Sequence, residues 1–154
     1  MNQKPLFTVE LKSFEPHTVR SGRGHKNVKK ELHDAIMKAV DGDEVGAARQ
    51  KVRDKALRID VEFRLWKGSD TTTNTRAKKD LDNLLKPVLD VLQTSLNTQK
   101  TESGLDLIEG DESVHEINAK KVIVDEERDE GIRIDIFEHK RSVSIHSAWP
   151  AVAD

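Results

Sequence analysis

Two aspartates separated by a single residue lie near the start of the segment KKDLDNLLKPVLDVL, which spans residues 78–92. Its leucines and valines recur at the i, i+3, i+4 and i+7 spacing of an amphipathic helix. Asp82 and Lys86 are four residues apart, and we expect them to share the face opposite that apolar stripe. A surface ion pair between them is one interpretation. Helix capping accounts for one acid here, and Asn83 is a further capable cap, so Asp80 and Asp82 together exceed what capping requires.

A second acidic cluster lies downstream, in the segment LIEGDESV. It offers Glu109, Asp111 and Glu112 just before a strand that is expected to begin near Val114. Carboxylates on loops at the ends of elements are typical ligands of a hard cation such as Mg²⁺. Without a cation, two carboxylates about 4 Å apart repel by ~4 kcal/mol at an effective dielectric constant of 20. Spacing along the chain does not establish whether this cluster meets the two upstream aspartates.

Hydrophobic periodicity predicts the elements that must position these acids. Strands are expected at residues 6–11, 56–66, 114–124 and 131–137, and helices at 27–40 and from Leu81 to Leu92. The polar run 41–55 is interpreted as a connection, and 125–131 as the connection of a hairpin. Pro87 removes one helical hydrogen bond, so an irregular start or a kink is expected in the second helix. The order β-α-β-α-β-β predicts an α+β fold with one mixed sheet and helices packed against it.

The composition bounds the class of protein. A chain of 154 residues with 35% apolar and 35% charged residues fits a single domain, expected at 1–139, followed by an irregular tail at 140–154. No run approaches the roughly 20 apolar residues of a membrane span, and the N-terminus lacks the apolar centre of a signal peptide, so a cytoplasmic protein without membrane association is expected. The absence of cysteine excludes disulfides, thiolate zinc sites and a cysteine nucleophile.

Charge is polarised along the chain. Residues 1–101 hold 20 Lys and Arg against 14 Asp and Glu, a net charge of +6, whereas residues 102–139 hold 4 against 13, a net charge of −9. The segment HTVRSGRGHKNVKK contains no acid and includes Arg20, Arg23 and Lys26. A phosphate-contacting arm and a solvated loop leading into a helix are equally good interpretations of this segment alone.

These motifs together resemble the RusA family of Holliday junction resolvases, or crossover junction endodeoxyribonucleases. In that family a basic residue precedes D-x-D-N-L-x-K at a helix start, and a second acidic motif opens the next strand. The first motif matches at Asp80, Asp82, Asn83, Leu84 and Lys86. The similarity covers roughly residues 57–137, with the basic segment in the place of the family's N-terminal Arg-rich segment.

The resemblance implies a homodimeric, Mg²⁺-dependent endonuclease that cuts branched DNA such as four-way junctions in recombination and repair, with Mn²⁺ able to replace Mg²⁺. By this carry-over Asp80, Asp82 and Asp111 bind the metal and Lys86 assists catalysis. The same comparison makes Lys78, Lys79 and the basic arm with Arg20, Arg23 and Lys26 contacts to DNA phosphates.

The chain departs from the family pattern in the second motif. Gly110 replaces the first of the usual paired acids, and Ser113 stands where Gln is common. The ligand is assigned to Asp111 because Val114 follows three residues later, with Glu109 and Glu112 as supporting or substitute ligands. The segment between the two motifs is also longer than the family's.

Other functions fit the sequence less well. A catalytically silent nucleic-acid-binding or assembly protein on the same fold is the main alternative, and cutting of flaps or forks is a closer variant. The pair His33 and Asp34 lacks the further ligands and the all-helical framework of metal phosphohydrolases. The run DGDE at 41–44 lacks the later ligands of a calcium loop, so a turn is expected there.

Overall fold

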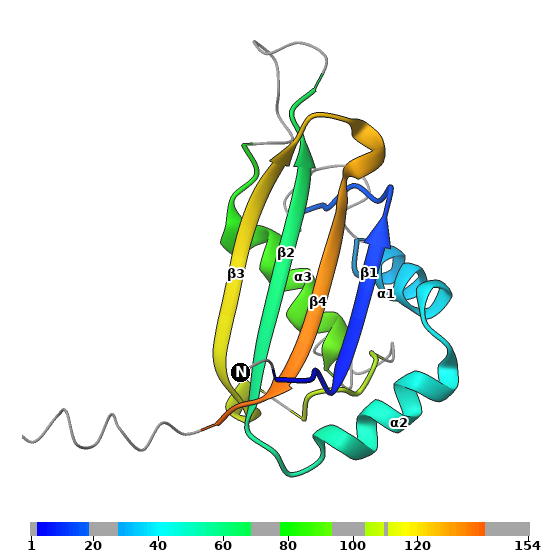
Figure 1. The fold of residues 1–154 in the computed structure, drawn as a ribbon, viewed down its shortest axis with the longest axis vertical. Helices are drawn as coiled ribbons and strands as arrows, with labels where there is room; N and C mark the ends of the chain where they lie inside the picture. Colours follow the sequence, from blue (N-terminus) through cyan, green and yellow to red (C-terminus); the bar gives the residue numbers. More distant parts are fainter. Residues whose placement is uncertain (1–2, 19–27, 69–77, 94–103, 110, 141–154) are drawn as a thin grey trace, which may run out of the picture.

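A four-stranded sheet forms the framework of the computed structural model, which describes residues 3–18, 28–68, 78–93, 104–109 and 111–140 (Figure 1). The elements in chain order are β1 (Phe7–Lys12), α1 (Val28–Ala39), α2 (Gly42–Val52), β2 (Leu57–Trp66), α3 (Leu81–Leu92), η2 (Asp111–Ser113), β3 (Val114–Val124), η3 (Glu127–Asp129) and β4 (Gly131–Glu138). They form a single small α+β domain, as the periodicity predicted. The predicted tail lies outside the described residues from 141 onward.

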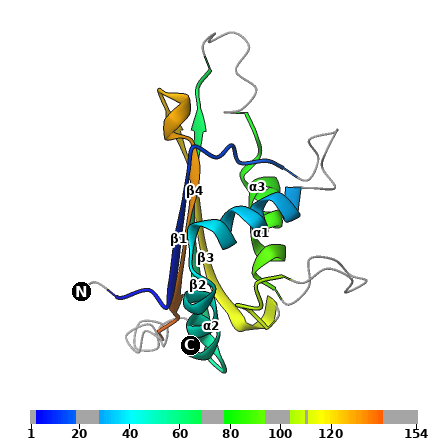
Figure 2. The ribbon, with the colours of Figure 1, turned by 90° about the vertical axis from the view of Figure 1, so that its right-hand side faces the viewer.

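The sheet is mixed and open, with the strand order β1-β4-β2-β3. β2 pairs in parallel with β3 and antiparallel with β4, which in turn pairs antiparallel with β1. α1 and α3 lie on one side of this sheet, and the opposite side carries no α-helix among the described residues (Figure 2). β1 and β3 are the edge strands, so each has one side that pairs with no other strand among the described residues.

The core lies between the sheet and its helices. In β2, Leu57, Ile59, Val61, Phe63 and Leu65 are all buried, while the residues between them are partly exposed. This alternation matches the period of two that the sequence shows. On the helices, the buried side chains that face the sheet include Leu32, Ile36, Leu84, Val88 and Leu92. α3 runs without interruption through Pro87, which is itself buried against the core.

The run 41–55 is not a simple connection, and the predicted element order was wrong at this point. It contains α2, so the order is β-α-α-β-α-β-β. Asp41 is the N-cap of this helix, because its carboxylate accepts a hydrogen bond from the backbone N–H of Asp43 at 3.1 Å. Val45, Ala48 and Val52 form its buried face. The DGDE run is therefore a helix start, and its weak apolar stripe concealed the helix.

The predicted hairpin was also wrong, because β3 and β4 are not neighbours in the sheet. β2 lies between them, and the connection through η3 crosses over the end of β2 (Figure 1). Glu130 fixes this crossing: its carboxylate is buried and accepts a hydrogen bond from the backbone N–H of Trp66 at 2.9 Å. The indole N–H of Trp66 donates to the carbonyl of Asp125 at 3.2 Å. β3 and β4 are close in sequence, which suggested that they pair with each other. In the structure each of them pairs with β2 instead.

None of the helices in the described ranges combines the length and apolar character that crossing a lipid bilayer requires.

Candidate functional site

The start of α3 presents two exposed carboxylates. Asp80 occupies the N-cap position with extended backbone, yet its side chain makes no capping hydrogen bond to the helix. Instead one oxygen accepts from the side-chain amide of Asn83 at 3.4 Å. Asp82 accepts from the backbone N–H of Asn83 at 3.0 Å. Each carboxylate retains one oxygen to which no described residue donates, so both are available to a ligand.

Lys86 lies one turn further along α3 and is exposed, as is Asp82. Leu84, which lies between Asp82 and Lys86, and Val88, which follows Lys86, are both buried. This confirms the predicted division of the helix into an apolar and a polar face. Within the described part of the chain no ion pair joins Asp82 to Lys86. The interpretation of these residues as a surface ion pair therefore has no support in the geometry.

Lys79 holds the start of α3 in place. Its side chain is only 14% exposed, and its ammonium donates to Glu15 at 2.8 Å and to the carbonyl of Pro16 at 2.6 Å. These bonds tie the segment that follows β1 to the helix start, and a phosphate contact by Lys79 would have to replace them. Lys78 is exposed. The predicted contacts Arg20, Arg23 and Lys26 lie outside the described residues.

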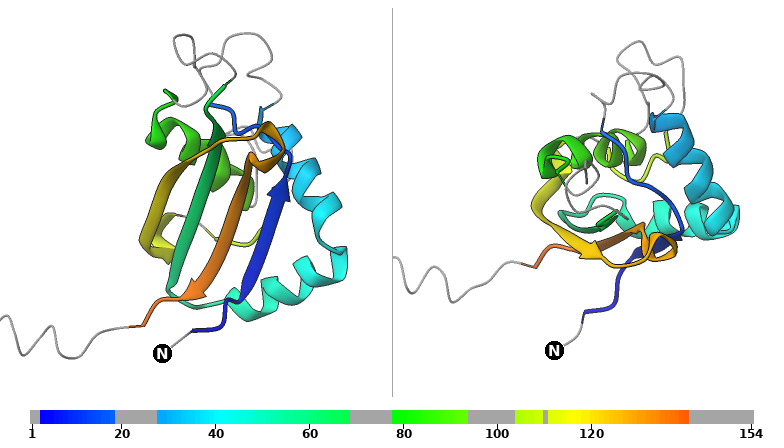
Figure 3. Two further views of the ribbon diagram at one scale, coloured as in Figure 1. Left: turned by 45° about the horizontal axis from the view of Figure 1, so that its top comes forward. Right: turned by 90° about the horizontal axis from the view of Figure 1, so that it is seen from above.

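The start of α3 is also fixed to β3. The ammonium of Lys121 donates to the backbone carbonyl of Lys79 at 2.9 Å. Lys121 lies seven residues beyond Val114, and at about 3.3 Å per residue this corresponds to roughly 23 Å along β3. Because η2 directly precedes Val114, the turn that begins with Asp111 lies at the other end of the strand (Figures 1 and 3).

The single chain therefore does not bring Asp111 beside Asp80 and Asp82. In the described ranges no group of three acids or histidines is placed to hold a metal ion. The path of the backbone explains the separation. The N–H groups of Leu105 and Leu107 donate to the carbonyls of Val91 and Leu92, both at 2.8 Å, and so fasten the following segment to the far end of α3.

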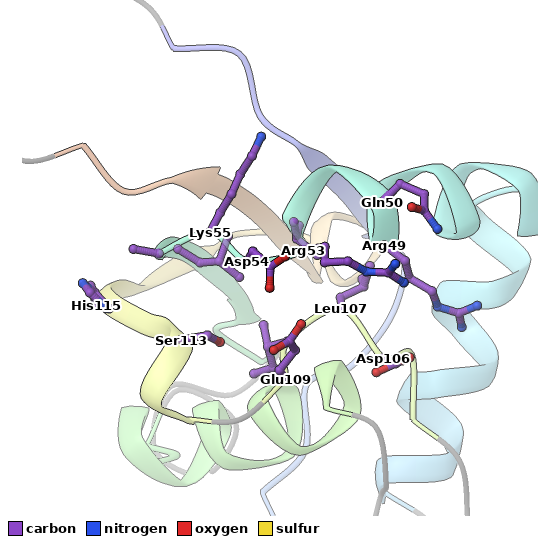
Figure 4. Close-up of a pocket in the computed structure, with 14 residues that line it drawn as sticks. Arg49, Gln50, Arg53, Asp54, Lys55, Asp106, Leu107, Glu109, Ser113 and His115 are labelled. Atoms are coloured by element: carbon purple, nitrogen blue, oxygen red, sulfur yellow. The ribbon is translucent and has the colours of Figure 1, made fainter.

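A pocket of about 270 Å³ lies beside η2 (Figure 4). Arg53 and Asp54 come from the end of α2 and the turn after it, and Glu109, Ser113 and His115 come from the segments around η2. Arg49 has a structural role here: its Nε donates to the carbonyl of Leu105 at 2.9 Å and so joins α2 to the segment before η2. The pocket thus gathers cationic, acidic and imidazole groups next to the predicted ligand Asp111, far from the start of α3.

The face of the sheet opposite the helices is the third polar surface. Four of its cations are paired with acids: Arg64 with Glu10 at 2.9 Å, Arg133 with Asp135 at 3.0 Å, Arg58 with Asp60 at 3.2 Å and Lys120 with Glu62 at 3.3 Å. The hydrogen bond and charge of Asp135, reinforced by Glu10 and Glu62, raise the pKa of Arg133. Because positive and negative groups alternate, this face offers little net attraction for a phosphate backbone.

The sequence matches no model of a known protein family and no curated protein.

The pocket beside η2 contains groups that the sequence pattern did not single out. Arg53 and Asp54 were assigned to a polar connection because the weak apolar stripe hid α2, and His115 showed no spacing typical of a metal ligand. The only available signal was the recurrence of Val45, Ala48 and Val52 at helical spacing. That pattern would have predicted a helix that ends near Val52, but not that the segments around η2 lie across the pocket from it.

Proposed function

We propose that this protein is a Mg²⁺-dependent endonuclease that hydrolyses phosphodiester bonds in branched DNA, of the type that resolves four-way junctions in recombination and repair. The observation that carries the proposal is the pair of exposed carboxylates at the start of α3, Asp80 and Asp82, with Lys86 exposed one turn later. Capping does not explain Asp80, since its side chain makes no capping hydrogen bond to the helix. The resemblance to the RusA family assigns these same three residues to catalysis.

The donor set fits the metal. Mg²⁺ usually takes one or two carboxylates, with waters and substrate phosphate oxygens completing its shell. Asp80 and Asp82 would supply those carboxylates, and Mn²⁺ would accept the same oxygen ligands. When bound, the ion would polarise the phosphodiester, lower the pKa of a bound water and stabilise charge on the departing oxygen.

The remaining residues of the site bind and orient the substrate. Lys86 extends from a well-anchored helix and would hold the phosphate as a point charge. Asn83 donates to Asp80 and so restrains the orientation of that carboxylate. Lys78 and the basic segment upstream of α1 would add contacts to the DNA backbone that do not depend on base sequence.

The proposal is tested with synthetic four-way junction, fork and linear duplex DNA, each with and without Mg²⁺. We expect the wild-type protein to nick the junction only with the metal. Asp82→Asn should lose cleavage while retaining binding, because the substitution removes a ligand charge from an exposed position without disturbing the core. Asp34→Asn, an exposed acid on α1, is the matched control and should cut normally.

A catalytically silent DNA-binding or assembly protein is the second candidate. The distance between the start of α3 and η2 favours it, since one chain leaves the predicted acids at opposite ends of β3. Junction binding without cleavage under Mg²⁺ or Mn²⁺ would support this alternative. Cleavage that persists in Asp82→Asn would contradict the assignment of the site.

A further inference from the structure

The N-terminus of α3 is not fixed by its own cap. At most helix starts the N-cap side chain accepts a hydrogen bond from a backbone N–H of the first turn, and this bond restrains the N-cap residue. Asp80 occupies the N-cap position of α3 but makes no such bond. One of its carboxylate oxygens accepts from the side chain of Asn83 at 3.4 Å, a long hydrogen bond. Other contacts must therefore hold Asp80 in place.

Lys121 on β3 supplies one of these contacts. Its ammonium donates to the backbone carbonyl of Lys79 at 2.9 Å. That carbonyl belongs to the peptide unit that joins Lys79 to Asp80, and a peptide unit is planar. A bond that fixes the carbonyl therefore also fixes the direction in which the chain enters Asp80. Lys121 is thus placed to orient Asp80 through the backbone.

The strand places Lys121 on the side of the sheet that α3 covers (Figure 2). In the pairing of β2 with β3, Lys121 is the partner of Phe63, which is buried between the sheet and the helices. Successive side chains of a strand point to opposite faces, so the neighbouring Lys120 points to the other side, where it pairs with Glu62 at 3.3 Å. Two adjacent lysines thus have different partners, an acid for Lys120 and a backbone carbonyl for Lys121.

The rest of α3 is anchored independently of this bond. Leu84 and Val88 are buried against the core. The far end of the helix is fastened by the N–H of Leu105, which donates to a helix carbonyl at 2.8 Å. Loss of the Lys121 ammonium should therefore leave the helix packed and change the restraint on the peptide unit before Asp80.

We propose that Lys121 is a positioning residue that holds Asp80 in the orientation in which its carboxylate accepts a divalent cation. The inference rests on the proposed function, which assigns a Mg²⁺ ion to Asp80 and Asp82. Contacts that orient a metal ligand from behind change metal affinity or activity by about 10- to 100-fold when they are removed. Lys121→Met removes the ammonium and keeps a long side chain, whereas Lys121→Arg keeps a charged donor.

The direction of the change separates positioning from simple charge. The ammonium of Lys121 is bonded to the residue that precedes Asp80. By Coulomb attraction alone, removing this positive charge would make the site more negative and strengthen cation binding. A positioning role predicts weaker binding, because the carboxylate is no longer held for the ion.

Mn²⁺ binding tests the proposal without using activity. Free Mn²⁺ is measured by electron paramagnetic resonance in titrations of the wild-type protein and its variants. We expect Lys121→Met to raise the Kd for Mn²⁺ by about 10-fold and Lys121→Arg to bind nearly as the wild type does. Lys120→Met is the matched control and should bind normally, because its partner Glu62 lies on the other face. Unchanged or tighter binding in Lys121→Met overturns the proposal.

The Mg²⁺ dependence of junction nicking is the second readout. In single-turnover reactions Lys121→Met should need about 10-fold more Mg²⁺ to reach half of its maximal rate, and excess Mg²⁺ should restore most of the wild-type rate. A merely structural role would instead lower the rate at every Mg²⁺ concentration, together with the free energy of unfolding in urea. That result, with an unchanged half-saturating concentration, would also overturn the proposal.

The two readouts separate the failure of the inference from the failure of the function. Weaker Mn²⁺ binding in Lys121→Met, in a protein that never cuts DNA, would remove the proposed function and keep the role of Lys121 at the cation site. Metal-dependent nicking with the same metal dependence in Lys121→Met and Lys120→Met would keep the function and reject that role. A wild-type protein that neither binds Mn²⁺ nor nicks the junction would reject both.

Discussion

Lys86 is the catalytic candidate whose role can be isolated most cleanly. Its side chain is exposed on α3, opposite the buried Leu84 and Val88, so substitution leaves the core intact. We expect Lys86→Met to lower the single-turnover rate of junction cleavage by about 10²- to 10³-fold, the cost typical of removing one group that stabilises transition-state charge.

Junction affinity should change little in this variant, because one cation among many contributes modestly to binding. Lys38→Met, an exposed lysine at the end of α1, serves as the control and should cut at the wild-type rate. Equal loss of binding and cleavage in Lys86→Met would assign Lys86 to DNA binding alone.

At the scale of elements, α2 is the helix that the sequence pattern failed to predict. Gly46 lies in its interior, and a Cβ added there would meet no atom within 4 Å. Gly46→Ala should therefore raise the free energy of unfolding by about 0.5–1 kcal/mol, since alanine loses less backbone entropy on forming a helix. Urea denaturation measures the change.

Gly131 at the start of β4 is the control position, where the same substitution should have the opposite effect on stability. A Cβ on Gly131 would lie 2.0 Å from the carbonyl oxygen of Leu11, a distance that requires the backbone to shift. Gly131→Ala should destabilise the protein, and a stabilising effect would contradict the register between β1 and β4. If Gly46→Ala were destabilising, residues 42–52 would not be a helix in solution.

At the scale of the whole molecule, the uneven distribution of charge predicts how DNA binding responds to salt. Arg20, Arg23 and Lys26 belong to the N-terminal part of the chain, whose net charge is positive, whereas Arg64 and Arg133 on the face of the sheet opposite α1 and α3 are paired with acids. Replacing the three by glutamine should reduce the slope of log K against log salt by up to ~2–3 on duplex arms, because each phosphate contact contributes about 0.9.

The matched control for this measurement replaces Lys38 and Lys51, exposed on α1 and α2, by glutamine. Affinity titrations between low and moderate salt should then show an unchanged slope. A slope that falls equally in both variants would mean that binding follows net charge and not a defined arm.

Much of the candidate site could be predicted from local patterns. The period of 3.6 residues in 81–92 determined that Asp82 and Lys86 face away from the core, and the structure confirms this. The period of two in 57–66 likewise determined which side of β2 is buried. Such patterns are reliable because each side chain's environment is set by its own helix or strand.

The arrangement of elements required the tertiary structure. No local pattern indicates that β2 separates β3 from β4, since strand order depends on contacts between residues far apart in the chain. The burial of Glu130 at the end of β2 is one such contact. α2 was missed for a related reason. Its apolar stripe is weak, so the helix depends on tertiary packing for its stability and its own sequence gives little sign of it.

Local patterns in the sequence were enough to predict the chemical groups and the faces that carry them: two carboxylates and a lysine on the exposed side of a helix start. The position of Asp111, at the opposite end of β3 from these groups, depends on how the elements pack together. The physical reason is that α3 extends along the sheet and the chain is fastened at the far end of this helix before it enters β3. Distance along the chain carries no information about that separation.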